Sequence, residues 1–128
     1  MNQQGFTIIE LLASMAIIAA LVGISVYQYT AYKTRAYNIT ALSDFRNGLT
    51  GIDTYYDDNE VYPTCSGAAC ETAVSGLALS NGVFLSFVAA GNNDVVAVAC
   101  HEKGTMNYTY PSLAGLVIQL PSTVCNGA

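Results

Sequence analysis

Charge is scarce in this sequence. Only 10 % of its 128 residues are charged, less than half the usual share, and 52 % are hydrophobic. A hydrophobic content this high excludes an intrinsically disordered chain. Lysine and arginine number 4 against 9 acids, so the net charge is −5, which excludes a protein that binds nucleic acid by neutralising phosphates. No nucleic-acid partner is therefore predicted.

Catalytic patterns are also missing from the sequence. It contains no G-x-S-x-G motif, no P-loop, no metalloprotease motif and no paired carboxylates. The single histidine, His101, lies in a predicted turn, where we expect a solvated side chain. Residues 92–94 offer oxygen ligands without a second acid nearby, so we expect a hairpin turn and no calcium site. The sequence predicts no enzyme, no metal and no cofactor.

The few charges divide the chain into two parts. Residues 6–53 hold three acids and three bases, whereas residues 54–128 hold six acids and only Lys103. Residues 11–26 read LLASMAIIAALVGISV, and with residues 6–10 they make 21 residues, enough for a helix of about 30 Å and one bilayer span. The sequence therefore predicts an apolar helix followed by an acidic head.

A cleaved secretory signal peptide is an alternative explanation for the apolar segment. Such a peptide begins with basic residues, whereas the start, MNQQ, has none, and the helical pattern continues beyond the apolar run. The nearest bases, Lys33 and Arg35, follow the segment, and the positive-inside rule alone would then place the N-terminus outside.

The residues that open the apolar segment form a motif. Residues 5–12 read GFTIIELL, in which Gly5 precedes Phe6 and Glu10 follows four residues later. This arrangement resembles the class III signal of type IV pilins. The resemblance implies that a membrane peptidase cuts between Gly5 and Phe6, that the amine of Phe6 is then methylated, and that residues 1–5 are a leader.

Two positions differ from the usual pattern of that family. Gln4 stands where a basic residue is usual, and Tyr27 stands where many members have a proline. Gly23 and Ser25 are weaker helix breakers than proline. We therefore expect the helix to be more continuous here than in relatives that carry the proline.

Glu10 also has a physical explanation. A carboxylate at the centre of a bilayer costs roughly 2.5–3.5 kcal/mol or more, so it usually has a partner or a function. Cleavage would create an ammonium group at Phe6, and between neighbouring subunits this pair can set the axial register. We predict Glu10 and Phe6 as the assembly site. The alternative is an acid that only lies at the membrane edge.

Beyond the apolar segment, hydrophobic residues recur every three or four positions, which predicts that the helix continues to about residue 57. Charged residues such as Asp44 and Arg46 lie on its other faces. Gly48 and Gly51 lie inside this helix, and we favour close approach of a sheet as the reason. The apolar stripe consists of Tyr32, Ala36, Ile39, Leu42, Phe45, Leu49, Ile52 and Tyr56.

The sequence of the head predicts a small antiparallel sheet. Residues 83–88, 95–100, 107–110 and 116–120 are β-prone, and turn signals separate them. One face of the sheet is expected to pack on the apolar stripe, which gives an α+β fold. The predicted organisation is a leader at 1–5, an apolar transmembrane or filament-core helix at 6–32, its amphipathic continuation at 33–58, and the head at 59–128.

All four cysteines, Cys65, Cys70, Cys100 and Cys125, lie in the head. In a small domain they indicate two disulfides and an oxidising compartment. We favour Cys65–Cys70 and Cys100–Cys125 among the three possible pairings, and pairing between the two loops stays open. A zinc site using His101 is less favoured, because Cys100 and His101 would point to opposite faces of a strand.

The combined interpretation is a structural subunit, the major pilin, of a type IV pilus. It would be held in the inner membrane, processed by the prepilin peptidase, and assembled by the pilus machinery into a helical homo-oligomer on the cell surface. Exchange of lipid contacts for helix contacts would drive assembly. The alternative is a pseudopilin of a type II secretion system, although those proteins generally lack paired cysteines. The small residues expected at packing seams are Ala13, Ala16, Ala20 and Gly23, with Ser14 and Ala19.

Overall fold

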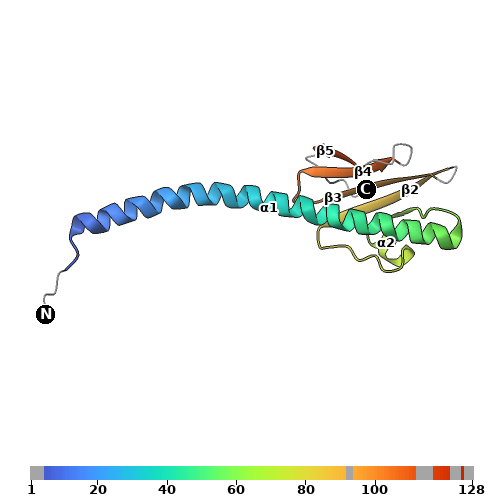
Figure 1. Cartoon of the computed structure of the whole chain (residues 1–128), viewed down its shortest axis with the longest axis horizontal. Coiled ribbons are helices and arrows are strands. Elements are labelled where there is room, and N and C mark those ends of the chain that lie inside the picture. The colour runs from blue at the N-terminus through green and yellow to red at the C-terminus, as the bar shows by residue number, and fades with distance from the viewer. Residues whose placement is uncertain (1–4, 92–93, 112–116, 122–124, 126–128) are drawn as a thin grey trace. The chain divides into compact units, whose positions relative to one another are not determined.

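A computed structural model describes residues 5–91, 94–111, 117–121 and 125. The chain divides into two compact units, Met1–Lys33 and Thr34–Ala128, and a single helix contributes to both. The elements in chain order (Figure 1) are α1 (Ile8–Asn59), β1 (Cys65–Ser66), α2 (Ala68–Ala73), β2 (Val83–Gly91), β3 (Asp94–His101), β4 (Met106–Pro111) and β5 (Ile118–Pro121).

The first unit consists of the apolar part of α1. The helix begins after Thr7 and runs without a break past Gly23 and Tyr27. Continuity agrees with the lack of proline in this stretch, because every residue there can donate its backbone N–H to the helix.

The far end of α1 differs from the prediction in one detail. The helix extends to Asn59, two residues beyond the predicted end, and the residue in the left-handed conformation is Glu60, with a φ of 58°. The backbone N–H of Glu60 donates to the carbonyl of Tyr56 at 2.7 Å. The Asn59 side chain instead donates to the carbonyl of Tyr55 at 2.9 Å. Asn59 therefore caps the helix with its side chain and not with a left-handed backbone.

The second unit is an α+β head. Its five strands form one antiparallel sheet in the order β1-β2-β3-β4-β5, so each strand pairs with its neighbours along the chain. The four predicted strands are present as β2 to β5, and Leu116, at the predicted start of the last, lies outside the described residues. The short elements β1 and α2 were not predicted. The second part of α1 lies across one face of the sheet (Figure 1).

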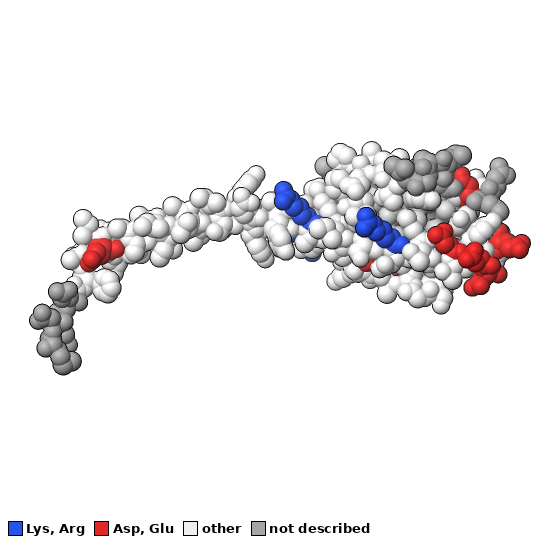
Figure 2. All heavy atoms as spheres, viewed as in Figure 1, with Lys and Arg blue, Asp and Glu red and all other residues white. Residues whose placement is uncertain are grey.

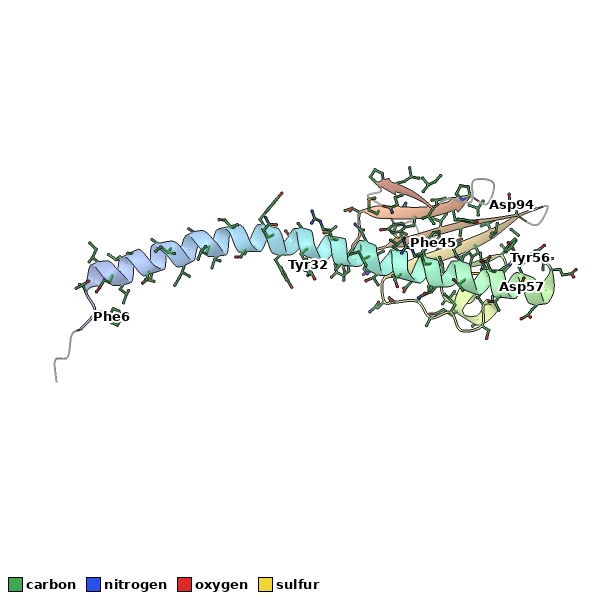
Figure 3. The ribbon with its side chains drawn as sticks, viewed as in Figure 1. Phe6, Tyr32, Phe45, Tyr56, Asp57 and Asp94 are labelled. Atoms are coloured by element: carbon green, nitrogen blue, oxygen red, sulfur yellow. A yellow bond between two sulfur atoms is a disulfide. The ribbon has the colours of Figure 1, made fainter. Side chains whose placement is uncertain are left out.

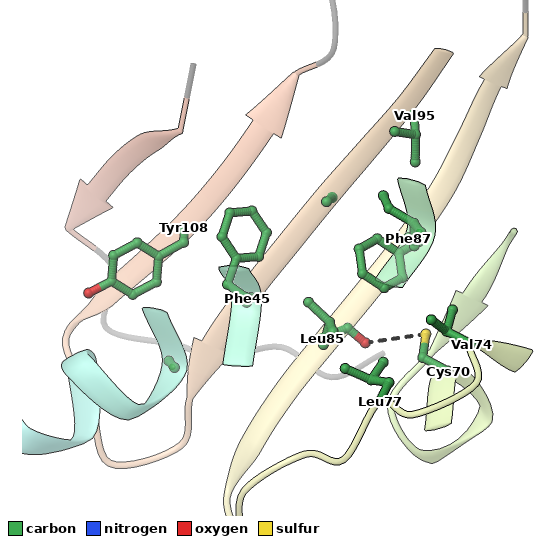
Figure 4. Close-up of a cluster of buried hydrophobic side chains, with 12 residues drawn as sticks. Phe45, Cys70, Val74, Leu77, Leu85, Phe87, Val95 and Tyr108 are labelled. Atoms are coloured by element: carbon green, nitrogen blue, oxygen red, sulfur yellow. Dashed lines mark hydrogen bonds between the residues drawn. The ribbon is translucent and has the colours of Figure 1, made fainter. Parts of the chain in front are cut away.

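The core lies between α1 and that sheet face. Phe45 and Ile52 of α1 are buried against alternate residues of the strands, such as Leu85, Phe87 and Val95 (Figure 4). Alternation arises because successive side chains of a strand point to opposite faces. The buried residues of α1 are Ala41, Asp44, Phe45, Gly48 and Ile52.

This buried stripe corrects the predicted one. Ile39, assigned to the apolar face, is 65 % exposed, and Asp44, assigned to a solvated face, is only 6 % exposed. Asp44 can be buried because the Ser80 backbone N–H donates to it at 2.7 Å and the Ser80 hydroxyl at 3.2 Å. The true stripe is therefore rotated toward Ala41, and it includes a carboxylate that helps to fix the loop before β2.

Two glycines allow close packing on α1. A Cβ atom at Gly48 would lie 2.8 Å from Leu85 and 2.9 Å from Phe87, so the sheet approaches the helix there as predicted. At Gly51 a Cβ atom would lie 2.7 Å from Val74, which follows α2. The expectation of sheet contact is therefore confirmed at Gly48 and wrong at Gly51, where the segment after α2 is the neighbour.

Disulfides join both favoured cysteine pairs. Cys65 is bonded to Cys70, with Cα atoms 5.0 Å apart, and this bond links β1 to α2. Cys100 is bonded to Cys125, with Cα atoms 5.6 Å apart, and this bond holds Cys125 to β3. Cys70 is fully buried, and its sulfur lies 3.9 Å from the carbonyl oxygen of Leu85 (Figure 4).

His101 corrects a second expectation. It is 5 % exposed, and its ring stacks on Tyr37 of α1 with centroids 4.5 Å apart. Its Nδ1 accepts the backbone N–H of Lys103 at 3.0 Å. The histidine is therefore a buried structural residue that helps to hold the β3–β4 turn, and the expected solvated side chain is wrong.

Candidate functional site

The candidate site begins where α1 begins. The backbone N–H of Thr7 donates to Glu10 Oε2 at 2.9 Å, and the Thr7 hydroxyl donates to the same oxygen at 2.8 Å. In return, the Glu10 backbone N–H donates to Thr7 Oγ1 at 3.4 Å. This reciprocal arrangement is a capping box, which satisfies backbone donors that the first turn of a helix leaves unpaired. Thr7 was missed as a functional residue, although Thr-x-x-Glu is a sequence signal for this motif.

The capping box uses only one side of the Glu10 carboxylate. Both hydrogen bonds from Thr7 end on Oε2, and within the described part of the chain no group donates to Oε1. Glu10 is exposed, so Oε1 is open to a donor from outside the chain. In apolar surroundings such a carboxylate would require a cationic partner.

The bond predicted to be cut is accessible. Gly5 and Phe6 precede α1, outside any regular element, and Phe6 is 91 % exposed. A Cβ atom at Gly5 would meet no atom within 4 Å. Phe6 lies before the start of α1 (Figure 3), so the described residues around the Gly5–Phe6 peptide bond are exposed.

The apolar part of α1 is exposed on all sides. It is long and apolar enough to cross a membrane, and the 18-residue window with this property has no buried residue. Three of its serine and threonine hydroxyls are satisfied within the helix, since Ser14, Ser25 and Thr30 donate to carbonyls three or four residues earlier at 2.8–2.9 Å. The surface is therefore suited to lipid or to other apolar helices.

Small residues occupy one face of this segment. Ala13, Ala16, Ala20 and Gly23 follow one another at steps of three, four and three residues, which places them on one side of a continuous helix. A Cβ atom at Gly23 would meet nothing within 4 Å. Another helix could approach this face closely, because small side chains let backbones come together.

Charge in the head gathers near the end of α1. Figure 2 shows acidic atoms clustered there and basic atoms over an earlier part of the helix. Among the described residues the one ion pair joins Lys103 to Glu102 at 3.5 Å, and both side chains are exposed. No group of three or more metal-binding side chains is found in the part of the chain that the structure describes.

Comparison with known proteins agrees with this arrangement. Residues 1–26 match the family described as the prokaryotic N-terminal methylation motif. The chain is 29 % identical over 126 residues to fimbrial protein EcpC of Eikenella corrodens, and the aligned region covers 98 % of this chain and 78 % of that protein. It is also 29 % identical over 105 residues to the type IV wide pilus major component PilA4 of Thermus thermophilus, and the aligned region covers 82 % of this chain and 79 % of that protein.

These relatives are structural proteins of pili and fimbriae, and none is named as an enzyme. Their similarity extends over most of the chain, beyond the N-terminal motif. With the methylation motif over residues 1–26 and the long helix packed on an antiparallel sheet, it shows a type IV pilin-like chain that is similar to fimbrial and pilus subunits.

Proposed function

We propose that this chain is the major structural subunit of a type IV pilus. The observation that carries the proposal is the contrast within α1: its apolar part has no buried residue, while its later part is packed into a closed core. A bare apolar helix needs an external cover. Lipid of the inner membrane covers residues 6–32 before assembly, and sister helices cover them in the filament.

Processing prepares the end of this helix for assembly. The prepilin peptidase removes residues 1–5, and the new amine of Phe6 is methylated. In the filament, the Phe6 ammonium of a neighbouring subunit donates to Oε1 of Glu10, while Thr7 holds the carboxylate through Oε2. Because each charge needs the other among apolar helices, the pair selects one axial register.

The relatives support the major subunit over a pseudopilin. The Thermus thermophilus relative is named as the major component of a type IV wide pilus. The two disulfides also favour a pilin head, exposed to an oxidising exterior. The face formed by Ala13, Ala16, Ala20 and Gly23 provides the packing seam between stems.

Mass spectrometry of sheared surface fibres tests this proposal. We expect abundant chain that begins at Phe6 and carries a methyl group on its amine. Gly5→Leu is the control, and it should leave an uncut chain in the membrane fraction. Chain found uncut in a soluble fraction, with no fibres, would contradict the proposal. Chain that is cut but absent from fibres, and needed for protein secretion, would instead indicate a pseudopilin.

A further inference from the structure

A small hollow lies on the head beside the end of α1. It has a volume of about 190 Å³ and is lined by Leu49, Ile52, Asp53, Tyr62, Val95 and Tyr110. A water molecule occupies about 30 Å³ of liquid, so the hollow has room for about six waters or the end of one long side chain. Ile52 and Val95 are buried and form an apolar floor, whereas Asp53 is exposed and the two tyrosines are half-buried.

The polar groups of this hollow suit a cation. Asp53 forms no ion pair within the described chain. Partial desolvation by the walls of the hollow, and then the charge of Asp57, raise the pKa of the Asp53 carboxyl, so its own surroundings oppose its charge. Burial of the Tyr62 hydroxyl, and then the negative charge of Asp53, raise the pKa of Tyr62. The effect of Asp53 agrees with the closeness of Asp53 and Tyr62 in the hollow. A carboxylate beside two phenol rings suits a guanidinium group, which accepts both hydrogen-bonded and stacked neighbours.

The chain itself supplies such a group. Arg46 is exposed on α1, seven residues before Asp53, which places it on the same side of the helix and about 10.5 Å along its axis. Its charge opposes the effect of burial on the pKa of Tyr108, so it lies near that ring. Tyr108 and Tyr110 are two residues apart on β4 and share one face of the sheet. Arg46 therefore lies beside the hollow of its own chain, and no ion pair with Asp53 is found among the described residues.

We propose that the hollow formed by Asp53, Tyr62 and Tyr110 binds the Arg46 guanidinium of a second copy of this chain. The two copies are parallel, and the second is displaced by about two turns along α1. A contact of this kind joins two different surfaces, so each new copy offers a free hollow to the next. It therefore repeats along a filament and never closes on itself. The inference rests on the proposed function and identifies a contact between heads.

Charge reversal in cells with the native assembly machinery tests this contact. Arg46→Asp and Asp53→Arg should each lower fibre yield about tenfold or more, since each sets like charges against one another. The double variant restores an opposite pair and should return yield to within about threefold of wild type. Asp58→Arg is the matched control, because Asp58 is an exposed acid of α1 that does not line the hollow.

Variants must be shown to fold, so the melting of each is measured in detergent micelles. If Asp53→Arg melts below the wild type, Asp53→Asn and Arg46→Gln replace the reversals. Each of these neutral variants should lower fibre yield about threefold, because one charge is then left unpaired at the interface.

Cross-linking locates the contact directly. Arg46→Lys keeps the positive charge and provides a primary amine. A carbodiimide joins this amine to the Asp53 carboxylate as an amide, with loss of one water. In fibres built from unlabelled and isotope-labelled chains, the linked peptides should carry one label from each copy.

The outcomes separate this inference from the proposed function. If the wild-type chain forms fibres and the single variants form them at wild-type yield, the inference is overturned while the proposed function stands. The same holds if the fibres give no peptide with one label from each copy. Rescue of Asp53→Arg by Arg35→Asp in place of Arg46→Asp also overturns it, because the hollow then has a different occupant. If the wild-type chain forms no fibres, the proposed function fails and the inference fails with it.

Discussion

The two units of this chain use hydrophobic residues in opposite ways. In the first unit, the leucine, isoleucine and valine side chains of α1 are exposed, and none of its most apolar window is buried. In the head, side chains of the same type, such as Ile52 and Leu85, are fully buried between α1 and the sheet. The head therefore contains its own core, while the first unit requires neighbours.

This difference assigns separate roles to the two units. Substitutions in the head are expected to change its folding, because they alter a closed core. Substitutions in the apolar part of α1 are expected to change assembly, because its partners lie in other molecules. Four predictions test this separation.

The largest effect is expected from Glu10→Leu. Loss of the carboxylate would leave a neighbouring Phe6 ammonium unpaired among apolar helices, at a cost of about 3–5 kcal/mol, which is roughly 100- to 4,000-fold in an equilibrium constant. The ratio of chain in sheared fibres to chain in membranes measures this effect. Thr7→Ala is the control, because it removes hydroxyl hydrogen bonds and keeps the charge. Its cost should be about 1 kcal/mol. Normal fibres from Glu10→Leu would contradict the assembly role.

The next effect concerns the core of the head. Phe45→Ala should lower the free energy of unfolding by about 3–5 kcal/mol, because Phe45 is fully buried against the sheet. Ile17→Ala, in the exposed apolar part, should change it by no more than about 0.5 kcal/mol. Denaturant unfolding of the full chain in micelles, followed by tyrosine circular dichroism, measures both. Equal effects would show that the two units do not fold separately.

The disulfides should rank by the length of chain that they close. Cys100→Ala with Cys125→Ala should cost about 3 kcal/mol, because that bond spans 25 residues. Cys65→Ala with Cys70→Ala spans 5 residues and should cost about 2 kcal/mol. Chemical denaturation of both double variants measures the ranking. The reverse order would show that burial of Cys70 matters more than loop length.

The smallest effect is expected from Asp53→Asn. Partial desolvation, and then the negative charge of Asp57, raise the pKa of the Asp53 carboxyl in the folded head. The folded head thus keeps this proton to higher pH than the unfolded chain does, and the associated stability is lost as pH rises through the folded pKa. At pH 7 the variant should melt about 2 °C above the wild type, and at about pH 3 the two should agree. Asp58→Asn is the control, because Asp58 is an acid of α1 that does not line the hollow. A lower melting temperature for Asp53→Asn than for the wild type at pH 7 would contradict this prediction, because it would show that the charged Asp53 stabilises the folded head.

Much of the fold could be predicted because its signals are local. The strands are short β-prone runs between turn residues such as Gly91 and Gly104, and pairing of chain neighbours needs no long-range information. The rotation of the buried stripe was missed because its cause is distant. Asp44 is buried through hydrogen bonds from Ser80, 36 residues later in the chain. Nothing near Asp44 in the sequence indicates that partner.

The same distinction holds for individual site residues. Glu10 was predicted because an acid in an apolar segment is unusual, and the capping role of Thr7 was available from a four-residue pattern. The burial of His101 could not be predicted from the sequence, because it depends on contact with Tyr37 of α1, whose ring stacks on the histidine. The hollow beside Asp53 was also out of reach, since α1, β3, β4 and Tyr62 must come together to form it.

The order of the strands has a consequence for how the head is made. Because every strand pairs with the one before or after it, the sheet can grow by successive hairpins as the polypeptide is made. The bond from Cys100 to Cys125 can close only after β4 and β5 have been made, because both strands lie between the two cysteines. Oxidation of this pair would then report that both strands are present, and an oxidant-deficient cell should accumulate heads whose strands are paired but which lack this disulfide.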